Sequence, residues 1–233
     1  MPSASSQGTP RKTSPRETGT RQRILDGALV VFGRYGYRQT SMEAVAEEVG
    51  LSRQALYRHF AAKEALFAAV VGSLHENALR AAREAVAAAR VAHADAAGVI
   101  AAQLDARSVH ILSRLQGSAH AAELAEENGR RCSAIAADVG RRFAGELATT
   151  IEEETRGRRL ALAPGLPASE LAEYLIVSAH GLKESGLPLE RYRRDLARLV
   201  RLIVTGAERA GSLAPKRPKP VRGRAPSRRG RAG

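Results

Sequence analysis

The sequence predicts an all-α fold, and the features of one long central stretch carry this prediction. No proline occurs between Pro15 and Pro164, and the stretch is dominated by Ala, Leu, Glu and Arg. These residue types favour helices, and the apolar residues among them recur at helical spacing. The stretch contains no alternating run of Val, Ile and Thr that would suggest a strand. Breaks between helices are expected near glycines 36, 50, 98, 117 and 129 and in the segment 157–167.

Length and composition restrict the class of protein. The 233 residues are 44% hydrophobic, which is enough for a small domain joined to a larger one. No apolar run approaches the roughly 18 residues of a membrane span, and the first residues lack the apolar centre of a secretory signal. The lone Cys132 excludes an internal disulfide framework and is interpreted as a small buried side chain. We therefore expect a cytoplasmic protein that does not contact a membrane.

The net charge of +13 is concentrated at the two ends of the chain. Eight basic residues follow Ala214 and three precede Glu17, with no acidic residue among either group, so the stretch between carries only +2. The ends are rich in Pro, Gly, Ser and Arg, and we interpret 1–17 and 213–233 as disordered basic arms. Such arms suit a polyanion such as DNA, although the C-terminal arm could equally serve only solubility.

Three short helices are expected after the N-terminal arm. Thr20 can cap the first helix, and Gly36 can adopt the left-handed conformation at its end. Thr40 and Glu43 have the spacing of a capping box for the second helix, which stops at Gly50. The inward positions of these two helices are apolar: Ile24, Leu25, Ala28, Leu29 and Phe32, then Val45, Ala46 and Val49.

The third helix has a polar outer face. Ser52 can cap it, and Leu56 and Phe60 lie one turn apart on its inner face. The tight turn at Gly50 and the small Ala46 complete the layout of a helix-turn-helix, in which the second helix enters the major groove of DNA. The outward residues are Arg53, Gln54, Tyr57 and Arg58. Arginine can bind guanine O6 and N7, and glutamine can bind adenine N6 and N7.

The stretch from Thr20 to Val70 resembles the DNA-binding region of TetR-family transcriptional regulators. The resemblance rests above all on TSMEAVAEEVGLS followed by ALYRHF and KEAL. It implies a three-helix helix-turn-helix domain at 18–64 and a larger helical domain for effector binding and dimerisation at 65–212. Base contacts are implied for Arg53, Gln54 and Ala55, and phosphate contacts for Thr40, Tyr57, His59 and Lys63. Ser41 is placed with this set, and Arg58 faces either phosphate or solvent.

One position departs from the family pattern. The family usually has a capping Ser or Asn before the lysine that opens its fourth helix, and this chain has Ala62. We therefore expect the start of that helix to be less firmly fixed.

The larger helical part carries fewer motifs. Helices are expected from Lys63 to about Ala88, around 95–115 and 117–125, and from 129 to about 155. Helical bundles bind small molecules between their helices, so an effector pocket is expected here. The candidate lining residues are Gln103, His110, Gln116 and Phe143, with His120 a further polar possibility; each could instead be a hydrogen-bonded core or surface group. Because Phe143 is the only aromatic residue between Phe67 and Tyr174, a site for flat organic cations is disfavoured.

Two apolar stripes near the C-terminus predict a further pair of helices, the first capped by Ser169. The stripes could pack within the chain, but the family resemblance implies that the pair meets its copy in a four-helix dimer interface. A symmetric dimer would present two recognition helices about one DNA turn, ~34 Å, apart, as a palindromic operator requires. The expected interface residues are Tyr174, Ser178, Leu182, Tyr192, Leu196, Leu199 and Ile203.

No sequence motif for catalysis, a cofactor or a metal site is present. The sequence therefore predicts a homodimeric, ligand-responsive transcriptional repressor that is not an enzyme and uses no cofactor or metal. Its partners would be double-stranded DNA carrying a palindromic operator, a second copy of itself and an unidentified small-molecule effector. The alternative is an effector-independent architectural or nucleoid-associated protein that binds DNA through its basic arms.

Overall fold

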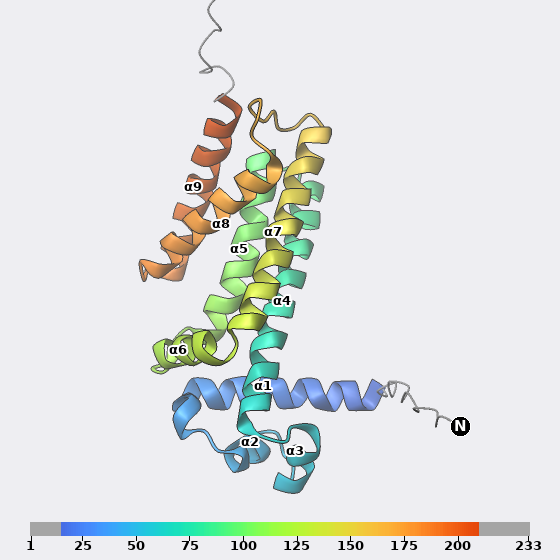
Figure 1. Ribbon diagram of the computed structural model, residues 1–233, viewed down its shortest axis with the longest axis vertical. Helices are drawn as coiled ribbons and strands as arrows, with labels where there is room; N and C mark the ends of the chain where they lie inside the picture. The colour runs from blue at the N-terminus through green and yellow to red at the C-terminus, as the bar shows by residue number, and fades with distance from the viewer. Residues whose placement is uncertain (1–14, 210–233) are drawn as a thin grey trace, which may run out of the picture.

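The computed structural model describes the backbone of residues 15–209 and the side chains of residues 18–208. This part of the chain is helical throughout and contains no strand, which confirms the all-α prediction (Figure 1). The first four helices are α1 (Pro15–Gln39), α2 (Met42–Glu48), α3 (Arg53–His59) and α4 (Lys63–Val91). They are followed by α5 (Ala96–Leu115), α6 (Ala121–Arg131), α7 (Ser133–Arg156), α8 (Ala168–Glu184) and α9 (Leu189–Arg209).

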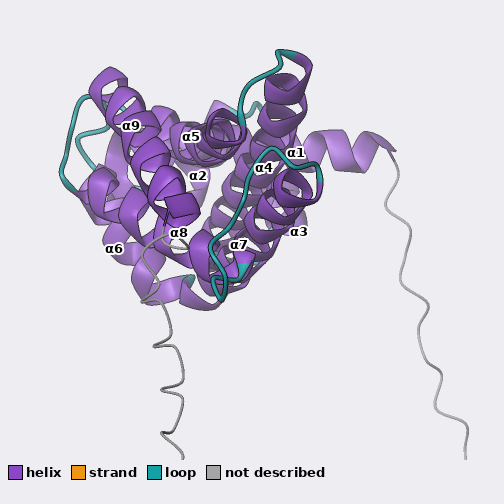
Figure 2. Cartoon of the chain, turned by 90° about the horizontal axis from the view of Figure 1, so that it is seen from above, coloured by secondary structure: helices purple, strands orange, loops and turns teal. Residues whose placement is uncertain are grey.

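The helices form a small lower part and a long upper bundle. In Figure 1, α1 lies across the base of the bundle, with α2 and α3 below it, and α4 rises from α3 into the upper part. The view from above shows α4, α5 and α7 clustered beside the α8 and α9 pair (Figure 2). Because α4 is one continuous helix, it joins the two parts without a flexible linker.

Two hydrophobic clusters correspond to these parts. The lower cluster contains Ile24, Phe32, Val45, Leu56 and Phe67, and it extends to Leu124 and Cys132 of α6. The upper cluster is built from residues of α4, α5, α7, α8 and α9 and of the segment before α8. Since α6 contributes to the lower cluster, its position is coupled to α1 as well as to the bundle.

Several helix ends differ from the predictions. The first helix begins at Pro15, so Thr20 lies inside it and caps nothing. The second begins at Met42 and is capped by Ser41, whose hydroxyl accepts a hydrogen bond from the Ala44 N–H. Ser169 likewise lies within α8, where Pro167 occupies the cap position without a side-chain hydrogen bond. Ser41 and Pro167 take the extended conformation that a cap needs.

Three further predicted boundaries moved by a few residues. The long α4 ends at Val91 rather than near Ala88, α6 runs from 121 to 131, and α7 begins at Ser133. Ala62 caps α4 without any side-chain hydrogen bond, as its side chain requires. The predicted basic arms lie outside the described residues, except that α1 includes residues 15–17.

Candidate nucleic-acid interface

The local sequence fixes the orientation of α3. The Ser52 hydroxyl accepts a hydrogen bond from the Ala55 N–H at 3.2 Å, and this cap defines the first turn. Gly50 has a φ of 66°, a left-handed conformation that suits glycine. The Leu51 N–H then donates to the Ala46 carbonyl at 2.9 Å, which closes the turn between α2 and α3.

The two faces of α3 separate as predicted. Leu56 and Phe60 are buried in the lower cluster, whereas Arg53, Gln54 and Arg58 are exposed. Tyr57 is 37% exposed despite its size. Ala55 and His59 are half-buried at the edges of the outer face. The exposed set therefore offers hydrogen-bond donors and acceptors from a helix that is anchored by its opposite side.

Arg53 is held in place on this face by two neighbours. One guanidinium N–H group lies 2.6 Å from a carboxylate oxygen of Glu43, on α2. The guanidinium carbon also lies 5.4 Å from the centroid of the Tyr57 ring, within the range of a cation–π contact. Tyr57, followed by Glu43, raises the pKa of Arg53. These contacts orient the side chain while leaving it at the surface, where a guanine edge could replace the carboxylate.

Thr40 differs from the sequence-based interpretation. Its side chain is buried, and its hydroxyl donates to the Gly36 carbonyl at 2.6 Å. The hydroxyl thus satisfies a carbonyl at the kink of α1, where Gly36 has a φ of 77°. The Thr40 hydroxyl is therefore neither accessible nor free in this geometry, and a phosphate contact by Thr40 stays a prediction. Ser41 is exposed, but its hydroxyl is the cap of α2.

Lys63 also has a structural task. Its ammonium group donates to the carbonyls of Tyr37, Arg38 and Thr40 at 2.9, 3.2 and 2.9 Å. It lies 4.7 Å from the centroid of the Tyr37 ring as well. An ammonium group has three N–H donors, and all three are used here. Lys63 therefore ties the end of α1 to the start of α4, and its contact with phosphate stays a prediction.

The sequence did not predict the hydrogen-bonded junction between α1 and the region of α6. The Ser118 hydroxyl donates to the Gly33 carbonyl at 2.7 Å, and the Arg38 N–H donates to Glu123 at 2.9 Å. Glu127 is buried and accepts hydrogen bonds from Arg131 at 2.6 Å and from Arg38 at 3.4 Å. Arg131 is the main cause of the lowered pKa of Glu127. This network connects residues 18–64, which we call the reading head, to the bundle.

The same junction has little spare room. A side-chain carbon at Gly36 would lie 2.2 Å from a Glu123 carboxylate oxygen and 2.9 Å from the His120 ring. His120 itself lies 3.3 Å from Glu123, so it belongs to this junction rather than to a ligand cavity. The only sequence signal for the junction was the glycine in the GRYGY turn.

The predicted pocket residues do not share one cavity. Gln103 is buried beside a cavity of about 280 Å³ near Glu146 and Thr150. Phe143 lines a different cavity of about 170 Å³, between α5, α7 and α8. Gln116 is exposed at the edge of a third, of about 390 Å³, and His110 lines none of these. Their role in binding an effector stays a prediction.

The residues predicted for the dimer interface differ in their exposure within one chain. Tyr192 and Leu196 are buried in the chain's own upper cluster. Tyr174 is 51% exposed. The residues Ser178, Leu182, Leu199 and Ile203 are half-buried. Val177 and Leu202, which were not predicted, are 70% and 71% exposed and extend the apolar surface of α8 and α9.

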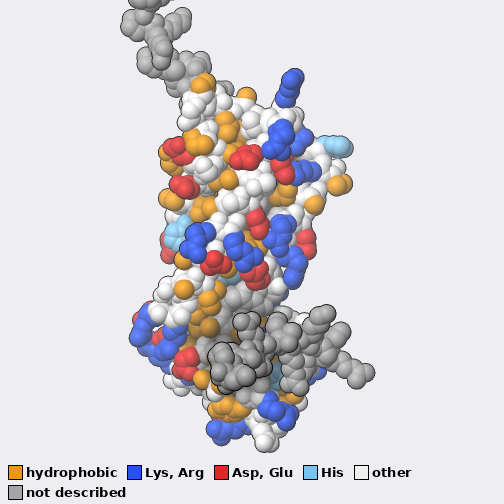
Figure 3. Space-filling view, turned by 45° about the vertical axis from the view of Figure 1, so that its right-hand side comes forward, with side chains coloured by type: hydrophobic (Ala, Val, Ile, Leu, Met, Phe, Trp, Pro, Cys, Tyr) orange, Lys and Arg blue, Asp and Glu red, His pale blue; other side chains and the backbone are white. Residues whose placement is uncertain are grey.

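The described residues contain neither a metal-binding cluster nor a membrane-spanning helix. Within residues 15–209, no group of three or more His, Cys, Asp or Glu residues is arranged to hold a metal ion. None of the helices in that range is long and apolar enough to cross a membrane. Blue and red side chains are interspersed over the helical body in Figure 3.

Comparison with known proteins shows which family the N-terminal part of the chain resembles. Residues 24–70 match the sequence model of the bacterial regulatory proteins of the tetR family. The HTH-type transcriptional regulator UidR of Escherichia coli strain K12 is 39% identical over 67 residues, which are 29% of this chain and 34% of UidR. The HTH-type transcriptional repressor Rv1474c of Mycobacterium tuberculosis is 36% identical over 61 residues, 26% of this chain and 33% of that repressor. Residues 24–70 of this chain are therefore similar to the regulatory proteins of the tetR family.

The family model ends at residue 70, and the matches to the relatives are short as well. They span about a third of the length of UidR and of the mycobacterial repressor. Solved structures extend the likeness in fold alone. A Mesorhizobium loti protein described as a TetR-family transcriptional regulator has a TM-score of 0.65 at 19% identity, covering 83% of this chain and 98% of that one. The TetR-family regulator PfmR of Thermus thermophilus has a TM-score of 0.52 at 20% identity, covering 80% and 100%.

Proposed function

We propose that this chain is a sequence-specific DNA-binding transcriptional regulator of the TetR family. The carrying observation is the outer face of α3, where exposed Arg53, Gln54 and Tyr57 stand on a helix anchored by buried Leu56 and Phe60. The N-terminal part of such a helix meets base edges in the major groove. Arg53 and Gln54 would read bases with Ala55 beside them, and Tyr57 and His59 would contact phosphates. Arg58 would contact phosphate or remain in solvent.

We further propose that it acts as a homodimer on a palindromic operator. The support is that Tyr174 and Val177 of α8 and Leu202 of α9 are large apolar side chains left exposed. An apolar surface of this kind on a helix pair is typical of an interface, and a two-fold axis through it would make the two reading heads equivalent. A repressor in the cytoplasm would then bind two half-sites separated by about one helical turn, ~34 Å.

Ligand response would use the junction between α1 and α6. A ligand that bound one arrangement of the bundle more tightly would move α6 and, through Glu123 and Glu127, the end of α1. The distance between the two reading heads would change, and the operator would be released. Coupling of this kind is typically worth ~1 to 3 kcal/mol.

Selection of binding sites from a random DNA pool tests the function. The full chain is expected to enrich an inverted repeat, and anisotropy titrations at two salt concentrations are expected to show a large ratio of specific to nonspecific affinity. An architectural protein would enrich no motif, and its binding would collapse as salt rises because phosphate contacts release counterions. That second result would replace the proposal with its alternative.

Two substitutions test the reading face. Arg53→Ala should relax the base preference at one operator position by ~1 to 3 kcal/mol, because one bidentate contact is lost. Tyr57→Ala should weaken binding to every sequence alike. Arg34→Ala is the matched control, since Arg34 is also exposed and also pairs with a glutamate of α2, Glu48 at 3.2 Å. If Arg53→Ala and Arg34→Ala bind the selected and random DNA equally well, α3 is not the reading helix.

A further inference from the structure

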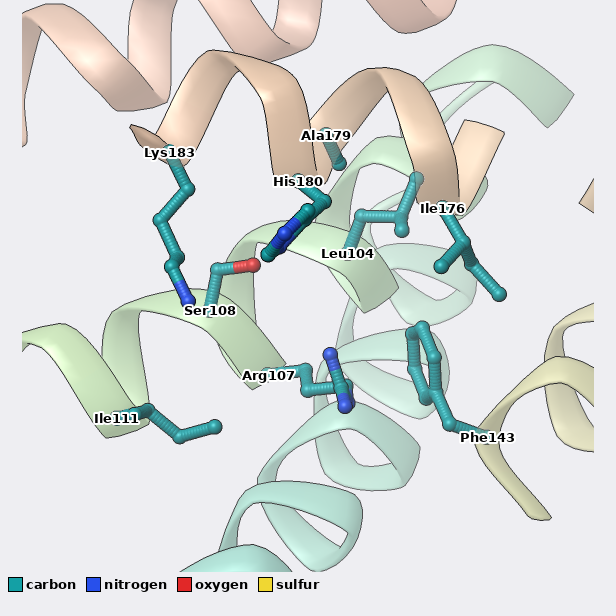
Figure 4. A pocket seen from close by; sticks show the side chains of 9 residues that line it. All are labelled: Leu104, Arg107, Ser108, Ile111, Phe143, Ile176, Ala179, His180 and Lys183. Atoms are coloured by element: carbon teal, nitrogen blue, oxygen red, sulfur yellow. The ribbon is translucent and has the colours of Figure 1, made fainter. Parts of the chain in front are cut away.

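A small cavity in the upper bundle is lined by basic and apolar side chains. It has a volume of about 170 Å³ and lies between α5, α7 and α8. In Figure 4, Arg107 enters it from α5, Phe143 from α7, and His180 and Lys183 from α8. The site is separate from the α3 surface and from the α1–α6 junction.

Arg107 is unusual among the arginines of the bundle. Its Nε atom is buried and has no hydrogen-bond partner, and no carboxylate of the described residues lies within ion-pair distance of its guanidinium. Its guanidinium carbon lies 4.4 Å from the centroid of the Phe143 ring. Arg90, by contrast, pairs with both Glu153 and Glu154. Because arginine does not deprotonate in proteins, Arg107 carries a half-buried charge that has no carboxylate partner among the described residues.

The neighbouring titratable groups are basic as well. Lys183 stands at the cavity wall, and its carboxylate neighbour is Glu184, on the solvent side at 3.7 Å. His75 of α4 has a buried Nδ1 atom without a partner. Burial, followed by the nearby Arg107 and Lys183, lowers the pKa of His75. Arg107 and Lys183 are the charged residues that line the cavity, and none of its lining residues is acidic, so this pair favours an anion in the space between them.

The rest of the wall is apolar and limits the ligand's size. Leu104, Ile111 and Ile176 face the cavity together with Phe143. A cavity of about 150 Å³ accommodates benzene, so this one holds roughly six to eight non-hydrogen atoms. Ile111 and Lys183 also line the cavity of about 390 Å³ that reaches Ala121 and Ala125 of α6. A longer aliphatic chain could continue into it.

We propose that this cavity binds a small aliphatic monocarboxylate. The carboxylate would accept paired hydrogen bonds from Arg107 and a further one from Lys183, and the aliphatic body would lie against Leu104, Ile111 and Ile176. Arginine forms such bidentate pairs with carboxylates readily. That this cavity is the effector site rests on the proposed function. Binding of the carboxylate itself can be tested without DNA.

Calorimetric titration of the full chain tests the ligand class. Hexanoate, octanoate and decanoate are compared with the alcohols and the alkylammonium ions of the same chain lengths. At least one carboxylate is expected to bind ten-fold or more tightly than its alcohol, and the ammonium ions are expected not to bind. Equal affinity of carboxylate and alcohol, or no binding of any carboxylate, would overturn the proposal.

Substitution of the arginine tests the site. Arg107→Met keeps an unbranched apolar stem and removes the guanidinium charge, and it is expected to weaken carboxylate binding at least ten-fold without lowering the melting temperature. Arg114→Met, at an exposed arginine of the same helix, is the control and is expected to bind like the parent. If Arg107→Met binds carboxylate like the parent, the site is wrong. Its melting curve by circular dichroism establishes that it is folded.

Operator affinity separates this proposal from the proposed function. It is measured by anisotropy with and without a saturating carboxylate. If carboxylate binding depends on Arg107 but operator affinity stays constant, the site stands and its assignment as effector site fails. If the selected operator is bound specifically but no carboxylate binds, the regulator stands and the ligand class fails.

Discussion

The reading head and the helical bundle differ in how completely their buried polar groups are hydrogen-bonded. In residues 18–64, every buried side-chain polar atom has a hydrogen-bond partner, as the Thr40 hydroxyl does with the Gly36 carbonyl. In the bundle, buried atoms without a partner include His75 Nδ1, Gln103 Oε1, Arg107 Nε and His110 Nε2. An unpaired buried polar group is costly, so the reading head avoids a cost that the bundle carries at these atoms.

Removal of a core side chain should distinguish the two regions most strongly. Leu56→Ala is expected to lower the free energy of unfolding by about 2 to 5 kcal/mol, because it leaves a cavity under α3. Urea titration measures the loss. The thiol of Cys132, which is buried in the same lower cluster, should react faster with a labelling reagent in this variant.

Leu171→Ala is the matched control in the upper cluster. It should cost a similar free energy while changing the Cys132 labelling rate less at low urea. Equal acceleration by both variants would show that the two regions open as one unit, contrary to the comparison.

A charge on the exposed face of the bundle should separate the dimer. Val177→Asp places a carboxylate on the apolar surface of α8, and we expect a loss of about 2 kcal/mol or more in dimerisation. Light scattering after size exclusion measures the mass. Val91→Asp, at an 81% exposed valine at the end of α4, should remain dimeric. A dimeric Val177→Asp variant would remove this face from the interface.

A buried carboxylate should make the bundle sensitive to acid. Glu154 accepts hydrogen bonds from Arg159 and Arg90, which lower its pKa. The folded chain therefore binds a proton here less readily than the unfolded chain, so the stabilisation is present above the usual glutamate pKa of about 4.3 and is lost as pH falls through the lowered value. Glu154→Gln should cost about 1 to 2 kcal/mol at pH 7, less than a fully buried pair, because both arginines are partly exposed.

Thermal melts between pH 7 and pH 3 check this prediction. The difference between the parent and Glu154→Gln should shrink as pH falls. Glu152→Gln, at an exposed glutamate of the same helix, should melt like the parent at every pH. A constant difference between the parent and Glu154→Gln would show that packing, not charge, explains the loss.

The smallest effect is expected from a missing cap. Ala62 has the extended conformation of a cap residue but no side-chain acceptor. Ala62→Ser should stabilise the start of α4 by about 1 kcal/mol, since serine accepts a hydrogen bond from the first turn. Ala61→Ser, one residue earlier and exposed, should change the unfolding midpoint little. Equal midpoints for both variants would show that the start of α4 is already fixed. The hydrogen bonds of Lys63 to the end of α1 would explain this result.

Local patterns in the sequence predicted the reading head well. The spacing of Leu56 and Phe60, the turn at Gly50 and the cap at Ser52 are decided within a few residues of one another, and the structure has all of them. The error at Thr40 has a local origin as well. Two adjacent hydroxyl residues compete for one cap, and Ser41 takes it because the Thr40 hydroxyl binds the carbonyl of Gly36.

The bundle was less predictable because its contacts join distant positions. Apolar stripes on α8 and α9 could not show which residues face inward, and Tyr192 and Leu196 turned out to complete the chain's own core. Arg107 and Lys183 lie 76 positions apart, yet they line one cavity.

The sequence alone determined the helices, the helix-turn-helix and the polar face of α3, since each depends on side chains within about two turns. The tertiary structure decided which polar groups are paired, where the cavities lie and which apolar face stays open, since each depends on how separate helices pack.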